Sequence, residues 1–568
     1  MTTVSTKRRG DKKARTTFSE APATAFFTTA TESEVSQATT TEPEISEQVW
    51  RGASIAVLAT AAALRLYAFA LKPLHHDEGV NAFFLTRLFR EGVYNYDPAN
   101  YHGPTLYYFT LPPVLALGLN TFAIRLVPAL FGLATVWLAL CLRRRIGAVG
   151  ALAAAALITV SPGAIYMSRY FIHEALFVFF TLGTVVAALR YYDTTRALYL
   201  MLAAASTALL FATKETAFIS AGVLVLASGI AWGVAWVAQR LGLWSDEEKS
   251  EGEKSGRSGG RNPASKWRAT ADVGTLARFG GAPRVAFLLL AAIALFIFIN
   301  VLFYSSFFTY AKGVEGALDT FQIWTETGNK DHTKAIYIYL WWIVQEESPL
   351  LLILGFVGAL LAVVRAKDNF AIFAGAWAFG ILAAYSIVPY KTPWLMLNFI
   401  IPLAIISGYG VELLYRWTAR RTVHWRTLTL ALMLAAIIVG AYQAIQLNFF
   451  HYDDDQYPYV YAHTRREFLD LVGEIERLAA RTGAGKETAI YVASPDYWPL
   501  PWYLRDYKRV GFHSRTGATT DPIVVANETQ EAELQRMLGA SYQKIGNSYP
   551  LRPGVNLVIY ARREVIEQ

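Results

Sequence analysis

Long uninterrupted apolar runs are the feature that most constrains how this chain can fold. They recur between residues 50 and 447 and contain few charged side chains. A helix of about 20 apolar residues spans the hydrocarbon core of a bilayer. The runs do not alternate apolar with polar residues, so they predict helices and not barrel strands. The predicted spans are 50–70, 121–142, 149–166, 173–190, 197–212, 216–238, 284–303, 348–364, 370–388, 393–415 and 427–447.

The composition agrees with an α-helical polytopic membrane protein of about eleven transmembrane helices. Hydrophobic residues make up 54% of the chain and charged residues only 17%, whereas soluble proteins carry about 25% charged residues. The net charge of +8 would suggest nucleic-acid binding in a soluble protein. Here the basic residues gather in short loops between the apolar runs, which is typical of membrane topology, so no nucleic-acid partner is expected.

The distribution of basic residues predicts the orientation. Alternate loops carry about twice as many basic residues as the others, and such loops face the cytoplasm in most membrane proteins. The basic loops include Arg143, Arg144 and Arg145, and also Arg420 and Arg421. We therefore expect a multi-pass protein of the cell membrane with a cytoplasmic N-terminus and an extracytoplasmic C-terminal region.

The chain divides into four predicted parts. Residues 1–48 are rich in Thr, Ser, Ala, Glu and Lys and predict a disordered cytoplasmic tail. Residues 49–447 form the transmembrane domain, interrupted at 240–282 by a flexible cytoplasmic loop rich in Glu, Lys, Ser and Gly. Residues 451–568 predict a small α/β extracytoplasmic domain, with helices at 464–481 and 530–538 and strands at 488–493, 522–526 and 555–561.

A polar cluster follows the first predicted span, at His75, His76, Asp77 and Glu78. Ionisable groups at a membrane boundary are costly unless they are solvated or have a function. Asp77 is the candidate general base, and Glu78 the second candidate catalytic carboxylate. A divalent metal bound by Asp77 and Glu78 stays an alternative, with the histidines tuning the carboxylates or binding phosphate. The structural alternative is a solvated helix end.

Other polar clusters fall in loops predicted to lie on the same external side. Arginine and lysine at one membrane face are suited to bind a lipid-linked phosphate. The alternative for each cluster is a side chain that reaches to the membrane interface, or an ordinary aromatic belt around His102. The candidate substrate-binding residues are His76, His102, Arg169, His173, Glu174, Lys214, Glu215, Tyr390, Lys391 and Trp394.

Several other chemistries have no motif in the sequence. It contains no glycine-rich nucleotide loop, no Ser-His-Asp arrangement and no zinc-ligand spacing. Its one cysteine, Cys141, excludes an intrachain disulfide. A donor that is itself carried by a lipid would need no nucleotide site, and no cofactor is required by any motif present.

Five segments, in this order, resemble the GT-C glycosyltransferases. They read HHDEGVNAFFLTRLFREGVYNYDP, YHGPTLYY, SRYFIHEALFVFF, ATKETAF and PYKTPWLMLNFIIPLAIISGYG. Within that class the chain resembles the dolichyl-phosphate-mannose protein mannosyltransferases and the lipid A aminoarabinose transferases. It is most similar to the flippase-activity-associated membrane proteins of archaeal N-glycosylation gene clusters and their bacterial relatives.

The resemblance implies a GT-C type fold and a sugar donor linked to polyprenyl phosphate. It places the acceptor-activating base at Asp77 and matches Arg169, Lys214 and Lys391 to basic residues that hold the lipid phosphate. At 102–104 this chain has His-Gly-Pro, where the mannosyltransferases have His-Pro-Pro and the aminoarabinose transferases Lys-Pro-Pro. The lysine contact of the second group is therefore missing here.

We expect a glycosyltransferase of the hexosyltransferase or mannosyltransferase type. It would move a sugar from the polyprenyl-phosphate donor to a hydroxyl of a glycan, lipid or protein acceptor at the external face of the bilayer. The alternative is a non-catalytic, flippase-associated or transport component for lipid-linked oligosaccharide, whose basic face would bind phosphate without chemistry.

Overall fold

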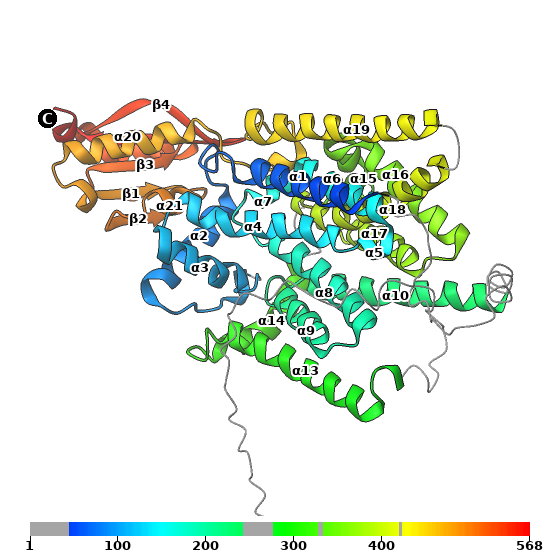
Figure 1. The fold of residues 1–568 in the computed structure, drawn as a ribbon. Helices are drawn as coiled ribbons and strands as arrows, with labels where there is room; N and C mark the ends of the chain where they lie inside the picture. The colour runs from blue at the N-terminus through cyan, green and yellow to red at the C-terminus, as the bar shows by residue number, and fades with distance from the viewer. Residues whose placement is uncertain (1–44, 101, 242–276, 328–332, 420–422, 568) are drawn as a thin grey trace, which may run out of the picture.

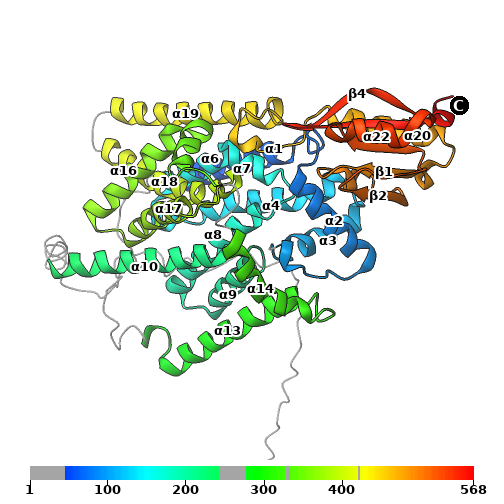
Figure 2. The same ribbon diagram turned by 180° about the vertical axis from the view of Figure 1, so that it is seen from behind.

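The computed structural model describes residues 45–100, 102–241, 277–327, 333–419 and 423–567. Most of the predicted N-terminal tail and of the 240–282 loop lies outside these residues. Figures 1 and 2 show a bundle of long helices with a small sheet domain at one end. The architecture is that of the predicted polytopic helical protein with a C-terminal α/β domain.

Eight helices of the described residues are long and apolar enough to cross a membrane, or up to ten if each of two bent pairs is one span. Seven of the eight are α1 (Glu47–Leu66), α4 (Thr121–Leu140), α8 (Glu174–Thr194), α10 (Ala217–Arg240), α13 (Ala282–Tyr304), α17 (Asn369–Ile387) and α19 (Val423–Ile445), which continues into η4 (Gln446–Phe450). The eighth joins η3 (Pro393–Met396) to α18 (Leu397–Ala419).

The remaining three predicted spans are also helical but differ from straight spans. The run 149–166 is broken by 62° between α6 (Ala148–Val160) and α7 (Pro162–Ser168). The run 348–364 is α16 (Pro349–Arg365), bent by 117° from the helix formed by α15 (Ile338–Trp342) and η2 (Ile343–Glu347). Both breaks coincide with a Ser-Pro pair, because proline cannot continue the hydrogen bonding of the preceding helix. The run 197–212 is α9 (Ala197–Phe211), only 15 residues long.

Small residues allow the central helices to approach closely. A Cβ on Gly408 of α18 would lie 2.3 Å from the carbonyl oxygen of Gly150 in α6, and a Cβ on Gly150 would lie 2.8 Å from the carbonyl oxygen of Gly408. Close backbone contact through small residues is typical of membrane helices. By contrast, α13 buries only Leu288 and Tyr304, and Figure 1 shows this helix at the edge of the bundle.

Several shorter helices connect or flank these spans. α5 (Arg143–Ile146) follows α4. α2 (His76–Glu91), η1 (Pro98–Asn100) and α3 (Thr105–Leu117) lie between α1 and α4, and α14 (Lys312–Thr327) follows α13. In both ribbon views α2 and α3 lie beside the sheet domain, at the same end of the bundle (Figures 1 and 2).

The C-terminal domain is a mixed five-stranded sheet with helices on both faces. The strand order is β2-β1-β3-β5-β4; β1 is parallel to β2 and β3, whereas β5 is antiparallel to β3 and β4. The strands are β1 (Ala489–Ala493), β2 (Arg509–His513), β3 (Ile523–Asn527), β4 (Tyr542–Arg552) and β5 (Val555–Arg562). The helices are α20 (Phe468–Arg481), α21 (Leu500–Tyr503), α22 (Glu531–Leu538) and α23 (Arg563–Ile566). Short 3₁₀ turns lie at η5 (Pro458–Val460), η6 (Gly485–Glu487), η7 (Glu528–Gln530) and η8 (Gly539–Ser541).

Alternation along the strands builds two cores. Ile490 and Val492 of β1 pack with α20 on one face of the sheet, and Tyr491 and Ala493 pack with α22 on the other. Successive side chains of a strand point to opposite faces, so β1, which is buried throughout, contributes to both cores.

Candidate active site

Asp77 lies in the first turn of α2, and His75 fixes the start of that helix. The Nδ1 atom of His75 accepts a hydrogen bond from the backbone N–H of Asp77 at 3.0 Å, while Glu78 Oε2 accepts one from the N–H of His75 at 3.0 Å. This reciprocal capping determines where the helix begins. The side chain of Asp77 is 40% exposed, so its carboxylate is accessible to a substrate.

Glu78 is turned the opposite way and is fully buried. Its two oxygens accept hydrogen bonds from Arg125 Nε at 2.8 Å and Nη2 at 2.7 Å, and Oε1 also accepts the N–H of Phe171 at 2.8 Å. Burial acts to raise the pKa of Glu78, but Arg125 outweighs it and holds the pKa below its ordinary value. Arg125 also donates to the carbonyl oxygens of Phe69, Lys72 and Pro73. The pair therefore anchors the loop before α2 to α4.

This pairing bears on the metal alternative. Each oxygen of Glu78 already accepts two hydrogen bonds, so neither is free to bind a cation. Among the described residues no group of three or more His, Cys, Asp or Glu side chains is arranged to hold a metal ion. The residues present thus do not fit the predicted metal site at Asp77 and Glu78.

His75 also links the site to the segment that follows the last span. Because Nδ1 accepts a hydrogen bond, the ring proton is on Nε2, which donates to the carbonyl oxygen of Tyr461 at 3.1 Å. Burial lowers the pKa of His75, which favours this neutral ring. His463 stacks on the His75 ring with centroids 5.6 Å apart, and its Nδ1 lies 2.7 Å from the hydroxyl of Tyr170.

The sheet domain holds α2 through further contacts. Arg552 Nη1 donates to Nδ1 of His76 at 3.0 Å, and burial lowers the pKa of His76 to about 4, so the ring is neutral near pH 7. The backbone N–H of Leu74 donates to the hydroxyl of Tyr503 at 2.9 Å. A Cβ on Gly79 would lie 2.7 Å from the Cβ of Pro499. His76 is thus a contact to the sheet domain in this structure.

Four predicted residues form a second cluster, at the ends of α8 and α9 and in the loop before α3. Lys214 Nζ donates to Glu174 Oε1 at 2.6 Å, and His102 Nδ1 lies 2.9 Å from Glu215 Oε2. Burial acts to lower the pKa of Lys214, but the two carboxylates outweigh it and raise that pKa. Burial acts to raise the pKa of Glu215, yet His102 and Lys214 hold it below its ordinary value. The cluster therefore carries paired charges.

The loop with His102 is held in place by its neighbours. Gly103 N–H donates to the Thr213 carbonyl at 3.0 Å, and a Cβ on Gly103 would lie 2.1 Å from the carbonyl oxygen of Ala212. Only glycine allows this approach. His173 Nε2 donates to the Gly103 carbonyl at 3.1 Å, and the rings of His102 and His173 lie 4.8 Å apart. Nδ1 of His173 is buried without a hydrogen-bond partner.

Arg169 and Lys391 contact backbone carbonyls at the ends of helices. Arg169 donates to the carbonyl oxygens of Tyr67 and, at 2.8 Å, Ala68, at the end of α1. Lys391 Nζ donates to those of Val388 and, at 3.0 Å, Ser386, at the end of α17. A cation there satisfies orphan carbonyls and interacts favourably with the helix dipole. Both side chains are buried, so in this structure they serve the fold.

Tyr390 lies near both Asp77 and the Lys214 cluster. Burial raises the pKa of its phenol, and the charges of Lys214 and Asp77 both act on it. One tyrosine is therefore close enough to both Asp77 and Lys214 to be influenced by their charges. Trp394 adds an aromatic wall, with ring centroids 6.4 Å from His75 and 6.1 Å from Tyr461.

The sequence reasoning missed Arg125, Tyr461 and His463. Arg125 could have been predicted to be important, because an arginine within an otherwise apolar span needs a buried partner. Tyr461 and His463 belong to the aromatic-rich stretch that follows the last span. Their contribution depends on a fold that brings this stretch back to the loop before α2, and no local sequence pattern predicts that contact.

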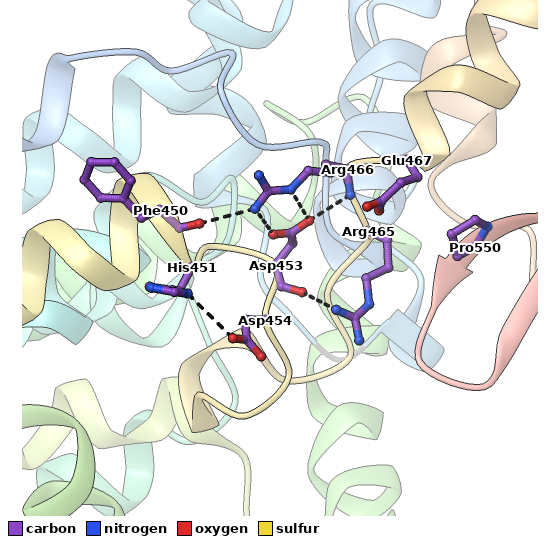
Figure 3. Close-up of a pocket in the computed structure, with 8 residues that line it drawn as sticks. All are labelled: Phe450, His451, Asp453, Asp454, Arg465, Arg466, Glu467 and Pro550. Carbon is purple, nitrogen blue, oxygen red and sulfur yellow. Dashed lines mark hydrogen bonds and ion pairs between the residues drawn. The ribbon is translucent and has the colours of Figure 1, made fainter.

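Figure 3 shows a polar pocket, separate from the two clusters above, at the junction between the end of α19 and the sheet domain. Its volume is about 520 Å³. Arg466 donates to both oxygens of Asp453 at 2.5 and 2.9 Å and to the Phe450 carbonyl at 3.2 Å, while Arg465 donates to the Asp453 carbonyl at 3.0 Å. These pairings fasten the sheet domain to the bundle.

Three solved structures have a similar fold. ArnT from Cupriavidus metallidurans in the apo state aligns with a TM-score of 0.55 over 90% of this chain and 98% of its own, at 15% identity. The same enzyme bound to undecaprenyl phosphate gives 0.51, with the same coverage and identity. The apo oligosaccharyltransferase of Archaeoglobus fulgidus gives 0.53, at 12% identity, over 82% of this chain and 64% of its own.

The fold shared with these structures is the predicted GT-C type. Within the chain, residues 102–240 match the family model of the dolichyl-phosphate-mannose-protein mannosyltransferases. The match includes the His102 loop and the Lys214 cluster and ends before the sheet domain. No curated protein matches the sequence.

Proposed function

We propose that this protein is an inverting glycosyltransferase that moves a sugar from a polyprenyl-phosphate donor to an acceptor hydroxyl at the external membrane face. The observation that carries the proposal is the exposed carboxylate of Asp77, held at the start of α2 by His75. The structural likeness to a transferase bound to undecaprenyl phosphate supports the donor class. The mannosyltransferase-family match over 102–240 supports glycosyl transfer.

In the proposed reaction Asp77 takes the proton of the acceptor hydroxyl as its oxygen attacks the anomeric carbon of the sugar. The bond between that carbon and the phosphate oxygen breaks, and the polyprenyl phosphate leaves with the electron pair. The leaving phosphate needs no proton, so one carboxylate is sufficient. Glu78 is not required as a second acid, which agrees with its buried pairing to Arg125.

Aromatic side chains near Asp77 are suited to contact a sugar. Tyr390 and Tyr461 are both acted on by the Asp77 charge, and Trp394 lies against Tyr461. The apolar ring faces can pack against the sugar, while the phenol groups offer hydrogen bonds. We therefore assign Tyr390, Tyr461 and Trp394 to the wall of the sugar site.

The test is transfer of labelled sugar from defined polyprenyl-phosphate donors by the purified full-length protein. Loss of a general base typically lowers the rate by about 10²–10⁴, so Asp77→Asn is expected to lose activity by this factor while keeping its melting temperature. Asp506→Asn is the matched control, since Asp506 is 57% exposed and its ion pairs, with Arg90 at 3.7 Å and Arg505 at 4.0 Å, are long. Near-normal transfer by Asp77→Asn would exclude the base role. Donor binding by the wild type without transfer to any acceptor would favour the flippase-associated alternative.

A further inference from the structure

The proposed reaction needs a cation beside the leaving phosphate, and the three cations matched to that role are already engaged. Arg169 and Lys391 donate to backbone carbonyls at the ends of α1 and α17. Lys214 is paired with Glu174 at 2.6 Å. A phosphate would have to compete with these partners for cations that are themselves buried. The cation that meets the phosphate is therefore better sought elsewhere.

Lys334 has the required properties. Its side chain is partly buried, and burial is the single influence that lowers its pKa, so no described carboxylate offsets its charge. Its ammonium lies 5.1 Å from the centre of the Tyr461 ring. A partly desolvated cation without a counter-charge attracts an anion more strongly than a paired one.

The backbone around Lys334 is attached to the site. Its N–H donates to the carbonyl of Pro389 at 3.3 Å, and Thr333 forms an antiparallel bridge with Tyr390. This anchors the lysine beside the loop that carries Tyr390 and Trp394. These two contacts hold the backbone from which the Lys334 side chain extends.

Tyr461 connects Lys334 with the proposed base. Its ring contacts the ammonium of Lys334, its carbonyl accepts the hydrogen bond from His75, and the charge of Asp77 acts on its phenol. Base and cation therefore both lie close to one aromatic residue. The proposed transfer needs both groups near the sugar, because the acceptor loses its proton as the phosphate leaves.

We propose that Lys334 binds the phosphate of the polyprenyl-phosphate donor, beside Tyr461. This inference rests on the proposed function and gives it the phosphate contact that the engaged cations do not provide. Lysine binds phosphate as a mobile point charge, so the site requires proximity more than a fixed geometry.

The experiment measures binding of farnesyl phosphate, a short polyprenyl phosphate, to the full-length protein in detergent, with neutral farnesol as the second ligand. Loss of a hydrogen bond to a charged group weakens binding about tenfold to a hundredfold. We expect this loss for Lys334→Ala with farnesyl phosphate and no change with farnesol. Lys334→Arg should retain most of the affinity because it keeps the charge.

Lys312→Ala is the matched control. Lys312 is an exposed lysine at the start of α14, and its replacement should leave both affinities unchanged. Wild-type-like binding of farnesyl phosphate by Lys334→Ala overturns the inference but leaves the proposed function standing. Equal loss of phosphate and alcohol binding also overturns it, because the role would then not depend on charge. A wild-type protein that binds no polyprenyl phosphate overturns both.

Discussion

Asp77 and Glu78 are neighbours in the chain, yet the first turn of α2 exposes one and buries the other. Consecutive helical residues point in directions about 100° apart, so one can face the site while the other faces α4. The buried position places Glu78 against Arg125 with no exposed surface on either side chain. The adjacent carboxylates thus have different surroundings: that of Asp77 is accessible, and that of Glu78 is paired in the interior of the fold.

Breaking this pair should destabilise the protein strongly. Removing one partner of a buried ion pair typically costs about 3–5 kcal/mol, because the other charge is left uncompensated. Glu78→Gln is therefore expected to lower the melting temperature of the detergent-solubilised protein, and Glu78→Gln with Arg125→Met to lower it less. Glu91→Gln is the control, since the Glu91 pair with Arg87 is half exposed and should be worth little. A Glu78→Gln melting curve that overlays the wild type would contradict the anchoring role.

The same pair gives a pH dependence. The pKa of Glu78 in the folded protein lies below its ordinary value of 4.5, so the unfolded chain takes up its proton first as the pH falls. The stability contributed by Glu78 is complete above about pH 5 and is lost as the pH falls through the folded pKa. In Glu78→Gln this acid-dependent part of the unfolding free energy should be missing.

At this scale the sequence could indicate candidate residues by their type and place, but not their partners. Asp77 could be singled out because an ionisable cluster follows directly on an apolar span. The pairing of Lys214 with Glu174, and of Arg169 with the end of α1, depends on how helices distant in sequence pack. Basic residues near a membrane surface can bind a phosphate or cap a helix. The amino-acid sequence around the residue looks the same in both cases.

At the scale of elements, α2 is the part of the site whose position depends most on close packing. The backbone of Gly79 faces Pro499, just before α21, with no room for a methyl group: a Cβ would lie 2.8 Å even from the Cα of Pro499. A shift of either element would move Asp77, two residues away. The glycine is therefore a requirement of the α2 contact with the sheet domain.

Gly79→Ala should lower both stability and transfer activity. Inserting a methyl group into a well-packed contact typically costs about 1–3 kcal/mol, here because the opposing atoms include backbone. Gly473→Ala is the matched control: Gly473 is also helical, and nothing lies within 4 Å of its added Cβ. That change should raise stability by up to about 1 kcal/mol. If both variants melt like the wild type, α2 is not held as tightly as the contact implies.

The continuous apolar runs allowed all eleven predicted spans to be recognised as helical. Of the described helices, however, eight to ten are long and apolar enough to cross a membrane, and α9, with 15 residues, is not among them. The bends at Pro162 and Pro349 could have been placed more sharply from the Ser-Pro pairs.

In the sheet domain, β2 and β4 were missed. Only β1 and β3 are buried throughout, whereas β2 is an edge strand and β4 shifts register between Ile545 and Tyr549. A strand in which apolar and polar residues do not alternate regularly is difficult to predict from the sequence.

At the scale of the whole molecule, the sheet domain and the helices α2 and α3 lie at one end of the bundle (Figures 1 and 2). We therefore expect them to share one side of the membrane. The excess of basic residues in the other set of loops leads us to expect that this side is extracytoplasmic.

Accessibility labelling tests this orientation. In a Cys141→Ser background, Ser514→Cys should react with a membrane-impermeant thiol reagent added to intact cells, because Ser514 is exposed on the sheet domain. Ser255→Cys, in the predicted cytoplasmic loop, should react only after the membrane is permeabilised. The reverse labelling pattern would invert the orientation and move the proposed reaction to the cytoplasmic face.

The contact between His76 and Arg552 joins residues 476 positions apart, and this has a consequence for biosynthesis. The ribosome makes α2 long before β4, the strand that will hold it, and the later apolar helices must be inserted in between. The start of α2, which carries the proposed base Asp77, therefore lacks this contact while most of the protein is translated. We expect activity only after β4 has been made and the sheet domain has folded, so that partly made chains are inserted in the membrane but inactive.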